Sequence, residues 1–302
     1  MRFTEKFTDY ELIDASRGER LERWGDILLI RPDPQIIWED DRTDPRWKQA
    51  HARYHRSSSG GGYWESYRKV PDVWTIGFEG LKFNLKPMGF KHTGLFPEQA
   101  VNWELMVGLI RKSGRQPRVL NLFAYTGGAT LACLAAGAAV THVDASKGMV
   151  AWGKENSRAS GLADRPVRWL VDDCVKFAER EIRRGNHYDG IVMDPPSYGR
   201  GPGGEVWKLE AQLSHLLDLT VELLSDQPIF FLLNSYTGGF SHTLLNYMVS
   251  RTVGARFGGR TVSDEIGLPV SDKRLILPCG NTTVWLPEGA PLPVSVPEQP
   301  KL

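Results

Sequence analysis

The sequence predicts an α/β protein in which a mostly parallel sheet carries helices on both faces and follows a small β-rich domain. From about residue 97 onward, segments with helical periodicity alternate with short apolar runs of strand length. Before residue 86, short β-rich segments alternate with turn residues, and no amphipathic helix pattern is clear. Because successive parallel strands need crossover connections, this alternation is typical of a doubly wound sheet. We therefore expect a β-rich domain over residues 1–85 and an α/β domain over residues 86–302.

Composition limits the class of protein. The 302 residues are 41% hydrophobic and 24% charged, which fits a soluble globular protein. No apolar run is long enough to span a membrane, and the first residues lack the apolar core of a signal peptide. The cysteines Cys133, Cys174 and Cys279 are far apart and lack metal-ligand spacing. We expect a cytoplasmic protein with neither a membrane span nor a metal, and the net charge of +1 gives no global attraction to nucleic acid.

The first 85 residues should form short strands and turns. Segments 26–31 and 35–38 are β-rich and flank a Pro-Asp-Pro turn. Residues 57–62, Ser-Ser-Ser-Gly-Gly-Gly, have the composition of a flexible loop. Residues 73–85 alternate apolar and polar positions, which predicts a β-hairpin.

The remaining elements are delimited by helix start and stop signals. Pro97 suits the first turn of a helix, and Gly137, Gly161 and Gly185 suit helix C-termini. The expected helices cover residues 97–111, 129–136, 146–160, 174–184, 208–225 and 243–253. The expected strands cover residues 118–123, 139–143, 168–170, 188–193, 229–233, 259–263 and 282–286.

The most informative segment is Asp194-Pro195-Pro196, which follows a buried strand and leads to Tyr198. The prolines fix their own φ angles, and Pro195 also biases Asp194 toward extended backbone. In open α/β sheets, ligands bind at the carboxyl ends of the strands. A carboxylate, a stiff backbone and an aromatic face can together hold a flat polar ring such as a nucleobase. The alternative is an ordinary strand-ending turn, because Asp-Pro is common in turns.

The first strand of the α/β part leads into a loop that should bind a nucleotide. This loop has no Gly-x-Gly-x-x-Gly sequence, and Phe123 and Tyr125 would obstruct a pyrophosphate. Gly127, at the start of the next helix, suits the carboxylate of an amino-acid moiety. Asp144, at the end of the next strand, can accept hydrogen bonds from both hydroxyls of a ribose. Asp173 could accept a hydrogen bond from an adenine amino group, or it could cap the helix that follows.

Several of these segments resemble motifs of one enzyme family. They read Phe-Ala-Tyr-Thr-Gly-Gly (123–128), Val-Asp-Ala-Ser (143–146), Asp-Asp-Cys (172–174) and Asp-Pro-Pro-Ser-Tyr (194–198). They look like motifs of class I S-adenosylmethionine-dependent methyltransferases, above all the group that modifies cytosine C5 and guanine N7 in large-subunit ribosomal RNA. Lys91 and the segment 94–99 also resemble that group. The resemblance implies a Rossmann-like sheet of seven strands with the last strand antiparallel, S-adenosylmethionine as cofactor, and RNA as substrate.

The resemblance also implies roles for individual residues. The expected cofactor-binding residues are Phe96, Phe123, Tyr125, Thr126, Gly127, Asp144, Ala145, Ser146, Asp173 and Cys174. Asp194 and the carbonyl of Pro195 would hold or polarise a nitrogen of the base, while Tyr198 stacks on it. Lys208 would lie near the active site, or it could simply begin a helix. For Cys174, a small apolar role beside the pocket is a better interpretation than catalysis.

The cysteine that cytosine-C5 chemistry requires is absent from its expected place. Those enzymes add a thiolate to C6 of the ring, and in the resembling group that cysteine follows strand five. Here Ser235 stands near that position, and no cysteine follows Pro196 closely. We therefore expect methyl transfer to a nucleobase without a cysteine adduct, since nitrogen methylation needs only orientation and, where necessary, proton removal.

An RNA-binding surface is predicted in residues 42–69, where basic and aromatic residues are interleaved. Arg53 and Arg56 are its candidate phosphate contacts, although a solvated loop with a few core aromatics would explain the same pattern. Residues 199–204, rich in glycine, suggest a mobile lid beside the base site. Two other functions remain open: a nucleotide-dependent oxidoreductase, and a non-catalytic RNA-binding protein that keeps a relic cofactor pocket.

Overall fold

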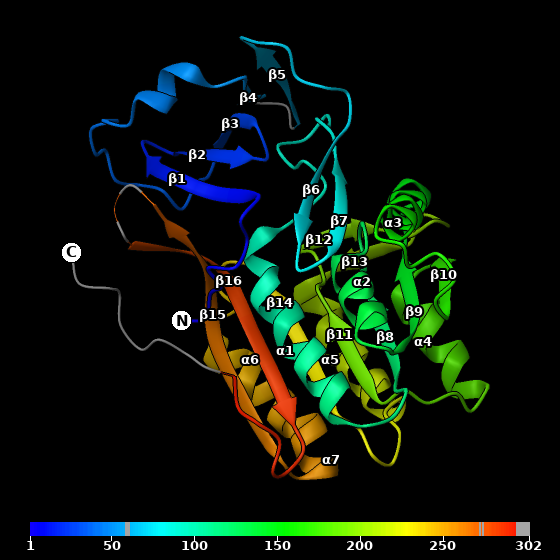
Figure 1. Cartoon of the computed structure of the whole chain (residues 1–302). Coiled ribbons are helices and arrows are strands. Elements are labelled where there is room, and N and C mark those ends of the chain that lie inside the picture. The colour runs from blue at the N-terminus through cyan, green and yellow to red at the C-terminus, as the bar shows by residue number, and fades with distance from the viewer. Residues whose placement is uncertain (58–60, 272, 274, 294–302) are drawn as a thin grey trace.

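The computed structural model describes residues 1–57, 61–271, 273 and 275–293. Its strands form one large sheet and two separate strand pairs (Figure 1). Residues 58–60 of the loop expected over residues 57–62 lie outside the described residues. The strands are β1 (Tyr10–Ser16), β2 (Glu19–Trp24), β3 (Ile27–Pro32), β4 (Ala52–Arg56), β5 (Gly62–Ser66), β6 (Trp74–Phe78), β7 (Leu81–Leu85), β8 (Arg118–Leu122), β9 (Ala139–Asp144), β10 (Val167–Val171), β11 (Gly190–Met193), β12 (Tyr198–Arg200), β13 (Val206–Lys208), β14 (Phe230–Ser235), β15 (Arg260–Val270) and β16 (Leu275–Leu286).

The six expected helices occur where the sequence predicts them, with shifted ends, and a short 3₁₀ helix, η1 (Pro45–Gln49), forms in the N-terminal region where no helix was expected. The first expected helix begins as a 3₁₀ turn, and the last one continues into a π-helical turn. They are η1 (Pro45–Gln49), η2 (Pro97–Gln99), α1 (Ala100–Lys112), α2 (Gly128–Ala135), α3 (Lys147–Ala159), α4 (Cys174–Arg183), α5 (Leu209–Glu222), α6 (His242–Val249), η3 (Ser250–Gly254) and α7 (Ala255–Phe257). Among the described residues, no helix is both long and apolar enough to cross a membrane.

The large sheet has the strand order β10-β9-β8-β11-β14-β16-β15-β1-β2-β3-β4-β5. Its first five strands are parallel, and β16 runs antiparallel to both β14 and β15. The first seven strands therefore have the arrangement that the resemblance implies. The expected count of seven is nevertheless wrong for the whole sheet, which has 12 strands.

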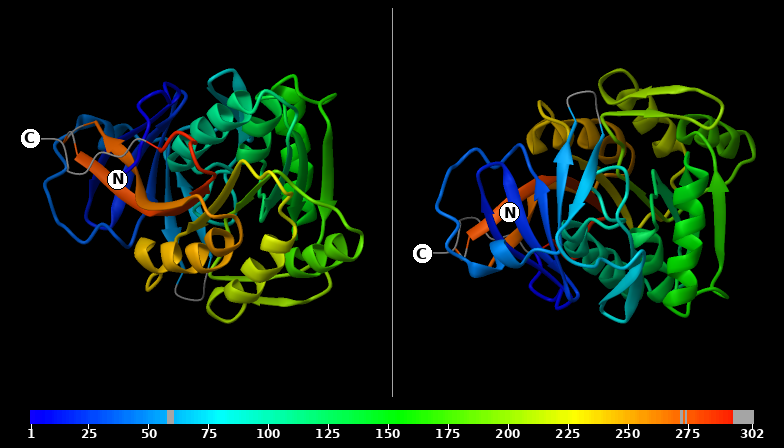
Figure 2. Two further views of the ribbon diagram at one scale, coloured as in Figure 1. Left: turned by 90° about the horizontal axis from the view of Figure 1, so that it is seen from below. Right: turned by 90° about the horizontal axis from the view of Figure 1, so that it is seen from above.

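The extra strands are the N-terminal ones. β15 runs to Val270, well beyond the expected 259–263, and at that end it pairs in parallel with Leu12 of β1. The backbone N–H of Ser271 donates to the carbonyl of Leu12 at 2.9 Å. Figure 2 shows the blue N-terminal strands beside the orange strands β15 and β16. The β-rich region thus continues the main sheet.

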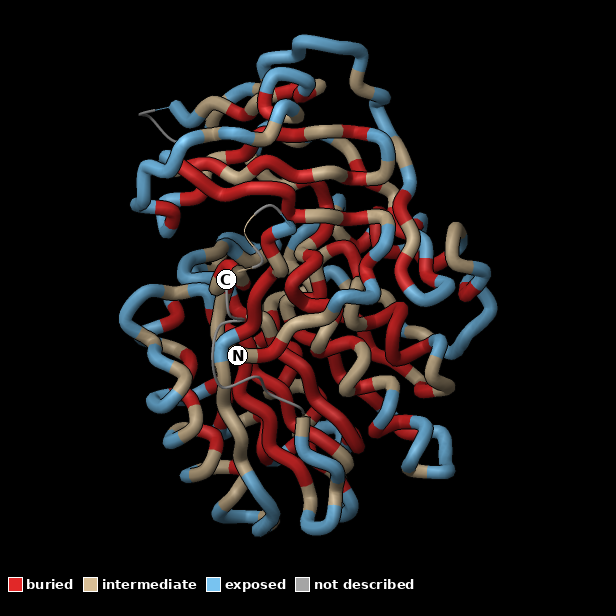
Figure 3. Tube along the Cα trace, turned by 60° about the vertical axis from the view of Figure 1, so that its left-hand side comes forward, coloured by how far each residue is buried: buried red, intermediate tan, exposed pale blue. Residues whose placement is uncertain are grey.

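Helices cover both faces of the parallel part of the sheet. Alternating side chains show this directly: Val119 packs in the cluster that includes α1 and α2, whereas Leu120 packs in the cluster that includes α4, α5 and α6. Because successive residues of a strand point to opposite faces, one apolar strand supplies both cores. The central strands are buried along most of their length (Figure 3). The sheet therefore places the carboxyl ends of its parallel strands along one rigid edge.

Three local expectations have different outcomes. The hairpin expected over residues 73–85 is confirmed, since β6 and β7 pair antiparallel. The strand expected over residues 35–38 is wrong, because this segment has no strand pairing and Ile37 is exposed. The lid expected over residues 199–204 is in part the ordered hairpin β12–β13, to which Trp207 adds a hydrogen bond from its indole Nε1 to the carbonyl of Pro196 at 2.6 Å.

Candidate functional site

A cavity of about 1020 Å³ lies at the carboxyl ends of β8, β9, β11 and β14. Its wall on one side comes from the parallel part of the sheet, and its opposite wall comes from β2, β3 and the segment before α1. The expected site residues that line it are Phe96, Phe123, Tyr125, Asp144, Ala145, Ser146, Asp173, Cys174, Asp194 and Pro195.

Asp144 is held at the cavity by two backbone hydrogen bonds. Its Oδ2 accepts from the N–H of Tyr125 and its Oδ1 accepts from the N–H of Ser146, each at 2.8 Å. Burial raises the pKa of this carboxyl group, and the two N–H groups oppose that rise. Phe123 and Tyr125 adopt positive φ angles of 54° and 49°, which are uncommon for residues with a side chain. These two backbone conformations are strained, and strain of this kind is often found at functional sites. Here it accompanies the hydrogen bond from the N–H of Tyr125 to Asp144.

Asp173 caps α4, as the helix-capping alternative predicts. Its Oδ1 accepts from the backbone N–H of Lys176 at 2.9 Å, and its other carboxylate oxygen accepts no hydrogen bond from the described residues. The neighbouring Asp172 forms an ion pair with Arg180 instead. Cys174 is buried, and burial raises the pKa of its thiol well above the ordinary value.

Thr126 and Gly127 lie behind the cavity wall. The hydroxyl of Thr126 donates to the carbonyl of Gly94 at 2.5 Å, and the N–H of Gly127 donates to the carbonyl of Ala124 at 3.0 Å. Thr126 and Gly128 line a smaller pocket of about 60 Å³, which shares Phe96 and Asp194 with the main cavity. The start of α2 therefore opens into a side pocket of its own.

Asp194 lines both pockets, and Pro195 lines the main cavity. Burial and the nearby carboxyl group of Glu98 raise the pKa of Asp194 to about 7. Tyr198 and Lys208 are both exposed and are not lining residues of the cavity. They flank the hairpin β12–β13, in which Tyr198 pairs with Lys208.

Sequence reasoning missed Glu98, Tyr236 and Cys279, all of which line the cavity. Tyr236 extends a row of rings, because its centroid lies 5.8 Å from that of Phe96, which in turn lies 5.4 Å from Tyr125. The phenol of Tyr236 also accepts a hydrogen bond from Gln99 at 2.7 Å. Glu98 belongs to the segment 94–99, whose sequence resembles the family, but the sequence did not indicate that Glu98 would be buried beside Asp194. Cys279 reaches the cavity through the register of β16, which no sequence motif marks.

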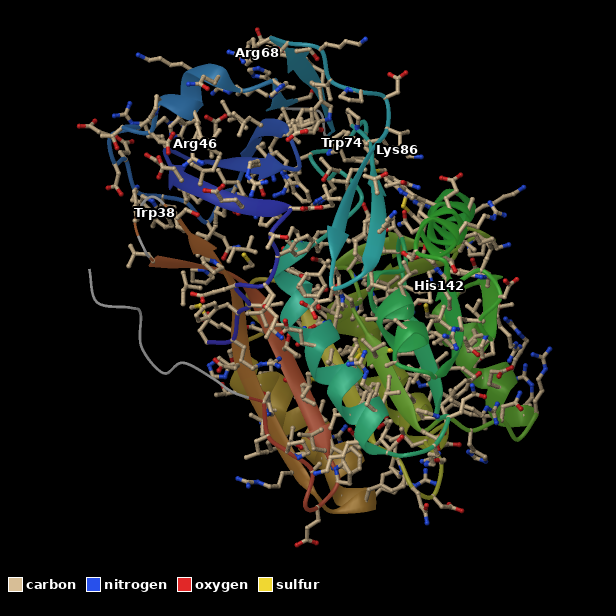
Figure 4. All side chains as sticks on the ribbon, viewed as in Figure 1. Trp38, Arg46, Arg68, Trp74, Lys86 and His142 are labelled. Atoms are coloured by element: carbon tan, nitrogen blue, oxygen red, sulfur yellow. The ribbon has the colours of Figure 1, made fainter. Side chains whose placement is uncertain are left out.

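The basic segment 42–69 is largely tied into the N-terminal strands. Arg53 pairs with Glu19 at 2.8 Å, Arg42 pairs with the same carboxylate, and Arg46 pairs with Asp44 at 2.7 Å. Figure 4 shows Arg46 and Arg68 on the N-terminal side of the molecule. Arg56 is exposed, and neither it nor Arg53 lines the cavity.

The aromatic residues of this segment differ in exposure. Trp47 and Tyr54 are buried, and Trp64 is half-buried, with its indole Nε1 donating to the carbonyl of Met88 at 2.9 Å. Tyr63 and Tyr67 are 63% and 50% exposed, so their rings can stack on a ligand from solution. In the part of the chain that the structure describes, no group of three His, Cys, Asp or Glu residues could hold a metal ion.

Comparison with known proteins agrees with this geometry. A family model described as S-adenosylmethionine-dependent methyltransferase matches residues 38–226. The ribosomal RNA large subunit methyltransferase K/L of Shewanella baltica is 36% identical over 150 residues, which are 48% of this chain and 20% of that protein. The corresponding protein of Shewanella oneidensis is 35% identical over the same share of each chain. The chain thus spans about a fifth of the length of the curated relatives it matches.

Solved structures extend the similarity over nearly the whole chain. The S-adenosylmethionine-dependent methyltransferase of Agrobacterium tumefaciens has a TM-score of 0.90 and 36% identity, covering 94% of this chain and 92% of that one. SMU.776, a methyltransferase solved with S-adenosylhomocysteine, shares the fold, with a TM-score of 0.71, 20% identity, and coverage of 93% and 76%. The family model covers more than half of the chain, so this protein belongs to the S-adenosylmethionine-dependent methyltransferases.

Proposed function

We propose that this enzyme transfers a methyl group from S-adenosylmethionine directly to a nucleobase of RNA, with ribosomal RNA as the substrate class. The observation that carries the proposal is that one cavity brings together Asp144, Asp173 and the Asp194-Pro195 corner. Two relatives that are 35–36% identical over about half of this chain are named ribosomal RNA large subunit methyltransferases. Their names support ribosomal RNA as the substrate class.

The chemistry of the cavity fits the cofactor. Asp144 offers a carboxylate whose position is fixed by two backbone N–H groups, which suits the two hydroxyls of a ribose. Phe123 and Cys174 give the adjoining wall an apolar surface for an adenine ring, and Asp173 keeps an oxygen without a partner among the described residues for its amino group. The side pocket at the start of α2 suits the amino-acid end. When bound, S-adenosylmethionine supplies an electrophilic methyl group on a sulfonium.

Asp194 and the carbonyl of Pro195 would orient the accepting nitrogen. A carboxylate accepts a hydrogen bond from an amino or ring N–H, and it can take up the proton as the nitrogen becomes bonded to the methyl group. With a pKa of about 7, Asp194 is balanced between its two forms at neutral pH, which suits a proton acceptor. Tyr198, exposed on the adjacent hairpin, would stack on the base from outside the cavity.

No thiol in the cavity is suited to attack the base. The nucleophile in cytosine-C5 chemistry is a thiolate, and burial raises the pKa of Cys174 and of Cys279 well above the ordinary range. Ser235 is buried, and its hydroxyl oxygen accepts a hydrogen bond from the N–H of Thr237 at 3.2 Å. We therefore propose direct transfer without a covalent intermediate.

The RNA would approach from the open side of the cavity. Arg56 and Lys208 are exposed and available for phosphate contacts, whereas Arg53 is paired with Glu19 and would contribute less. We also propose that residues 1–85 act as a substrate-contacting domain and residues 86–302 as the methyl-transferring domain.

The experiment is mass spectrometry of nucleosides from ribosomal RNA of a strain that lacks the gene. One methylated base should be absent, and it should return when the purified protein and S-adenosylmethionine are added to that RNA. Return of no base, combined with binding of RNA, would indicate a non-catalytic RNA-binding protein. Tight binding of NADH and not of S-adenosylmethionine in calorimetry would support an oxidoreductase instead.

A further inference from the structure

The proposed function gives no role to the half of the cavity that faces the N-terminal strands. Its wall contains Arg20 from β2, Arg31 from β3, and Lys91 and His92 from the segment before α1. Beside these cations lie the carboxyl groups of Asp33 and Glu98 and, behind the wall, that of Glu22. Arg20, Arg31 and Lys91 therefore face three carboxyl groups, and a ligand would be bound by those cations that keep N–H groups without a partner.

Lys91 makes its hydrogen bond to a neutral acceptor. Its Nζ donates to the carbonyl oxygen of Pro32 at 3.3 Å, and within the described ranges no carboxylate forms an ion pair with it. Burial, together with Arg20, Arg31 and Arg56, lowers its pKa to about 8, while Asp33 opposes that decrease. His92, which lies beside the same cations, has a pKa lowered to about 3 and is neutral. An ammonium group in such surroundings is stabilised when an anion binds next to it.

Arg20 also keeps unused hydrogen-bonding capacity. Its Nη2 pairs with Asp33 at 2.8 Å, and its Nη1 lies 3.8 Å from Glu22. Among the described residues its buried Nε finds no hydrogen-bond partner, which is costly for a polar group. Arg31 differs, since it binds Glu22 through two nitrogens at 2.5 and 2.7 Å and the carbonyl of Lys91 through a third at 3.1 Å. Arg31 holds the wall in place, whereas Arg20 and Lys91 retain N–H groups that can bind a ligand.

In the proposed function, the carboxylate of S-adenosylmethionine is bound outside this half of the cavity. Asp144 and Asp173 mark the adenosine end, and the side pocket at the start of α2 suits the amino-acid end. Asp194 lines both the main cavity, which also contains Arg20 and Lys91, and the smaller side pocket. A substrate that places its reacting atom at Asp194 would extend the rest of itself toward Arg20 and Lys91.

We propose that Arg20 and Lys91 form an oxyanion subsite that binds a phosphate group of the substrate nucleotide, so that the N-terminal strands complete the substrate half of the cavity. This inference rests on the proposed nucleobase substrate. The guanidinium of Arg20, whose side chain is 11% exposed, offers Nη1–H, and the ammonium of Lys91 offers two further N–H groups. The buried Nε–H of Arg20 would join them after a shift of the side chain. Guanidinium and ammonium groups are both standard phosphate ligands.

The test is calorimetric titration of the protein, saturated with S-adenosylhomocysteine, with AMP, GMP, CMP and UMP and with the four matching nucleosides. At pH 7, at least one monophosphate should bind about tenfold or more tightly than its nucleoside, because charge-assisted hydrogen bonds are strong. The preference should be lost in Lys91→Gln and in Arg20→Gln, and in the wild type it should shrink between pH 7 and pH 9 as Lys91 loses its proton. Lys82→Gln removes an exposed lysine outside the cavity and should keep the preference.

Three results would overturn the inference: no preference for monophosphates in the wild type, an unchanged preference in Lys91→Gln, or a loss in Lys91→Gln of affinity for S-adenosylhomocysteine but not for 5′-methylthioadenosine. The last result would assign the subsite to the cofactor's carboxylate. If Arg20→Gln fails to fold, Arg20→Lys keeps the charge but removes Nε, and it should show a partial loss. A phosphate preference without methylation of any RNA would refute only the proposed function.

Discussion

Asp194 takes its chemistry from its surroundings. A buried strand carries it to the cavity, two prolines stiffen the backbone after it, and Glu98 adds a second carboxyl group nearby. Burial also raises the pKa of Glu98 itself, so the two acids disfavour simultaneous ionisation. The position of Asp194 could be predicted from the sequence, because its motif is contiguous. The influence of Glu98 could not, because it depends on how the segment before α1 folds back over the strand ends.

Asp194 should make both activity and stability depend on pH. Its pKa of about 7 lies above the unfolded value, so its contribution to stability is fully present below about pH 4 and is lost as pH rises through 7. Asp194→Asn should therefore raise the free energy of unfolding at pH 8 but hardly at pH 4, as measured by urea denaturation. The wild-type methyl-transfer rate should rise between pH 6 and pH 8. Equal effects of Asp194→Asn on stability at both pH values would refute this assignment.

Asp144 should govern affinity for the cofactor. Asp144→Ala removes a charged acceptor, and hydrogen bonds to charged groups contribute about 1.5–3 kcal/mol each. Calorimetry should show binding of S-adenosylmethionine weakened by about tenfold or more. Asp164→Ala, which replaces an exposed aspartate outside the cavity, serves as the control and should bind normally. Unchanged affinity in a folded Asp144→Ala variant would exclude Asp144 as the ribose ligand.

At the scale of elements, the local sequence specified most helices and parallel strands well. Gly137, Gly161 and Gly185 all adopt positive φ where the helices end, as their role as C-terminal signals requires. The lengths of β15 and β16 were underestimated. Their paired ends near residues 270 and 275 owe their strand conformation to pairing and not to an alternating sequence pattern. The strand predicted over residues 35–38 was wrong for the opposite reason, because this segment has a β-rich composition but pairs with no strand.

The contact of α1 with α2 gives a prediction at this scale. A Cβ on Gly128, the first residue of α2, would lie 2.6 Å from the indole of Trp103. Gly128→Ala should therefore destabilise the protein by about 1–3 kcal/mol through overpacking. Gly108→Ala is the matched control, because a Cβ added to Gly108 in α1 would meet no packing neighbour within 4 Å among the described residues. That variant should gain about 0.5–1 kcal/mol from helix propensity, so urea midpoints that move in the same direction would contradict the packing account.

For the whole molecule, the continuous sheet ties the N-terminal strands to the methyltransferase core. One apolar cluster includes Tyr10 and Trp24 from the N-terminal strands together with Trp103 and Met106 of α1. Phe78 connects the parts, since its ring lies 4.8 Å from Phe7 and 5.6 Å from Trp103. The boundary expected near residue 85 stays a prediction, and composition could not show that the strands on its two sides pair in one sheet.

The shared core predicts cooperative unfolding. Phe78→Ala should cost about 3–5 kcal/mol and should lower the stability of the whole chain in one transition. Phe90→Ala, which truncates a ring that is 60% exposed, should change stability little. Urea unfolding followed by tryptophan fluorescence and by far-ultraviolet circular dichroism tests this. Two separated transitions, of which only one moves in Phe78→Ala, would indicate independent domains.

The measurement that most directly tests the account is transfer of a radioactive methyl group to RNA from the deletion strain by three proteins: the wild type, a variant with Cys133, Cys174 and Cys279 replaced by alanine, and Asp194→Asn. Direct transfer at Asp194 predicts that the cysteine-free variant keeps most of the activity. Asp194→Asn should lose several orders of magnitude in rate while calorimetry shows nearly normal binding of S-adenosylmethionine. An inactive but folded cysteine-free variant that binds the cofactor, beside an active Asp194→Asn variant, would contradict the account.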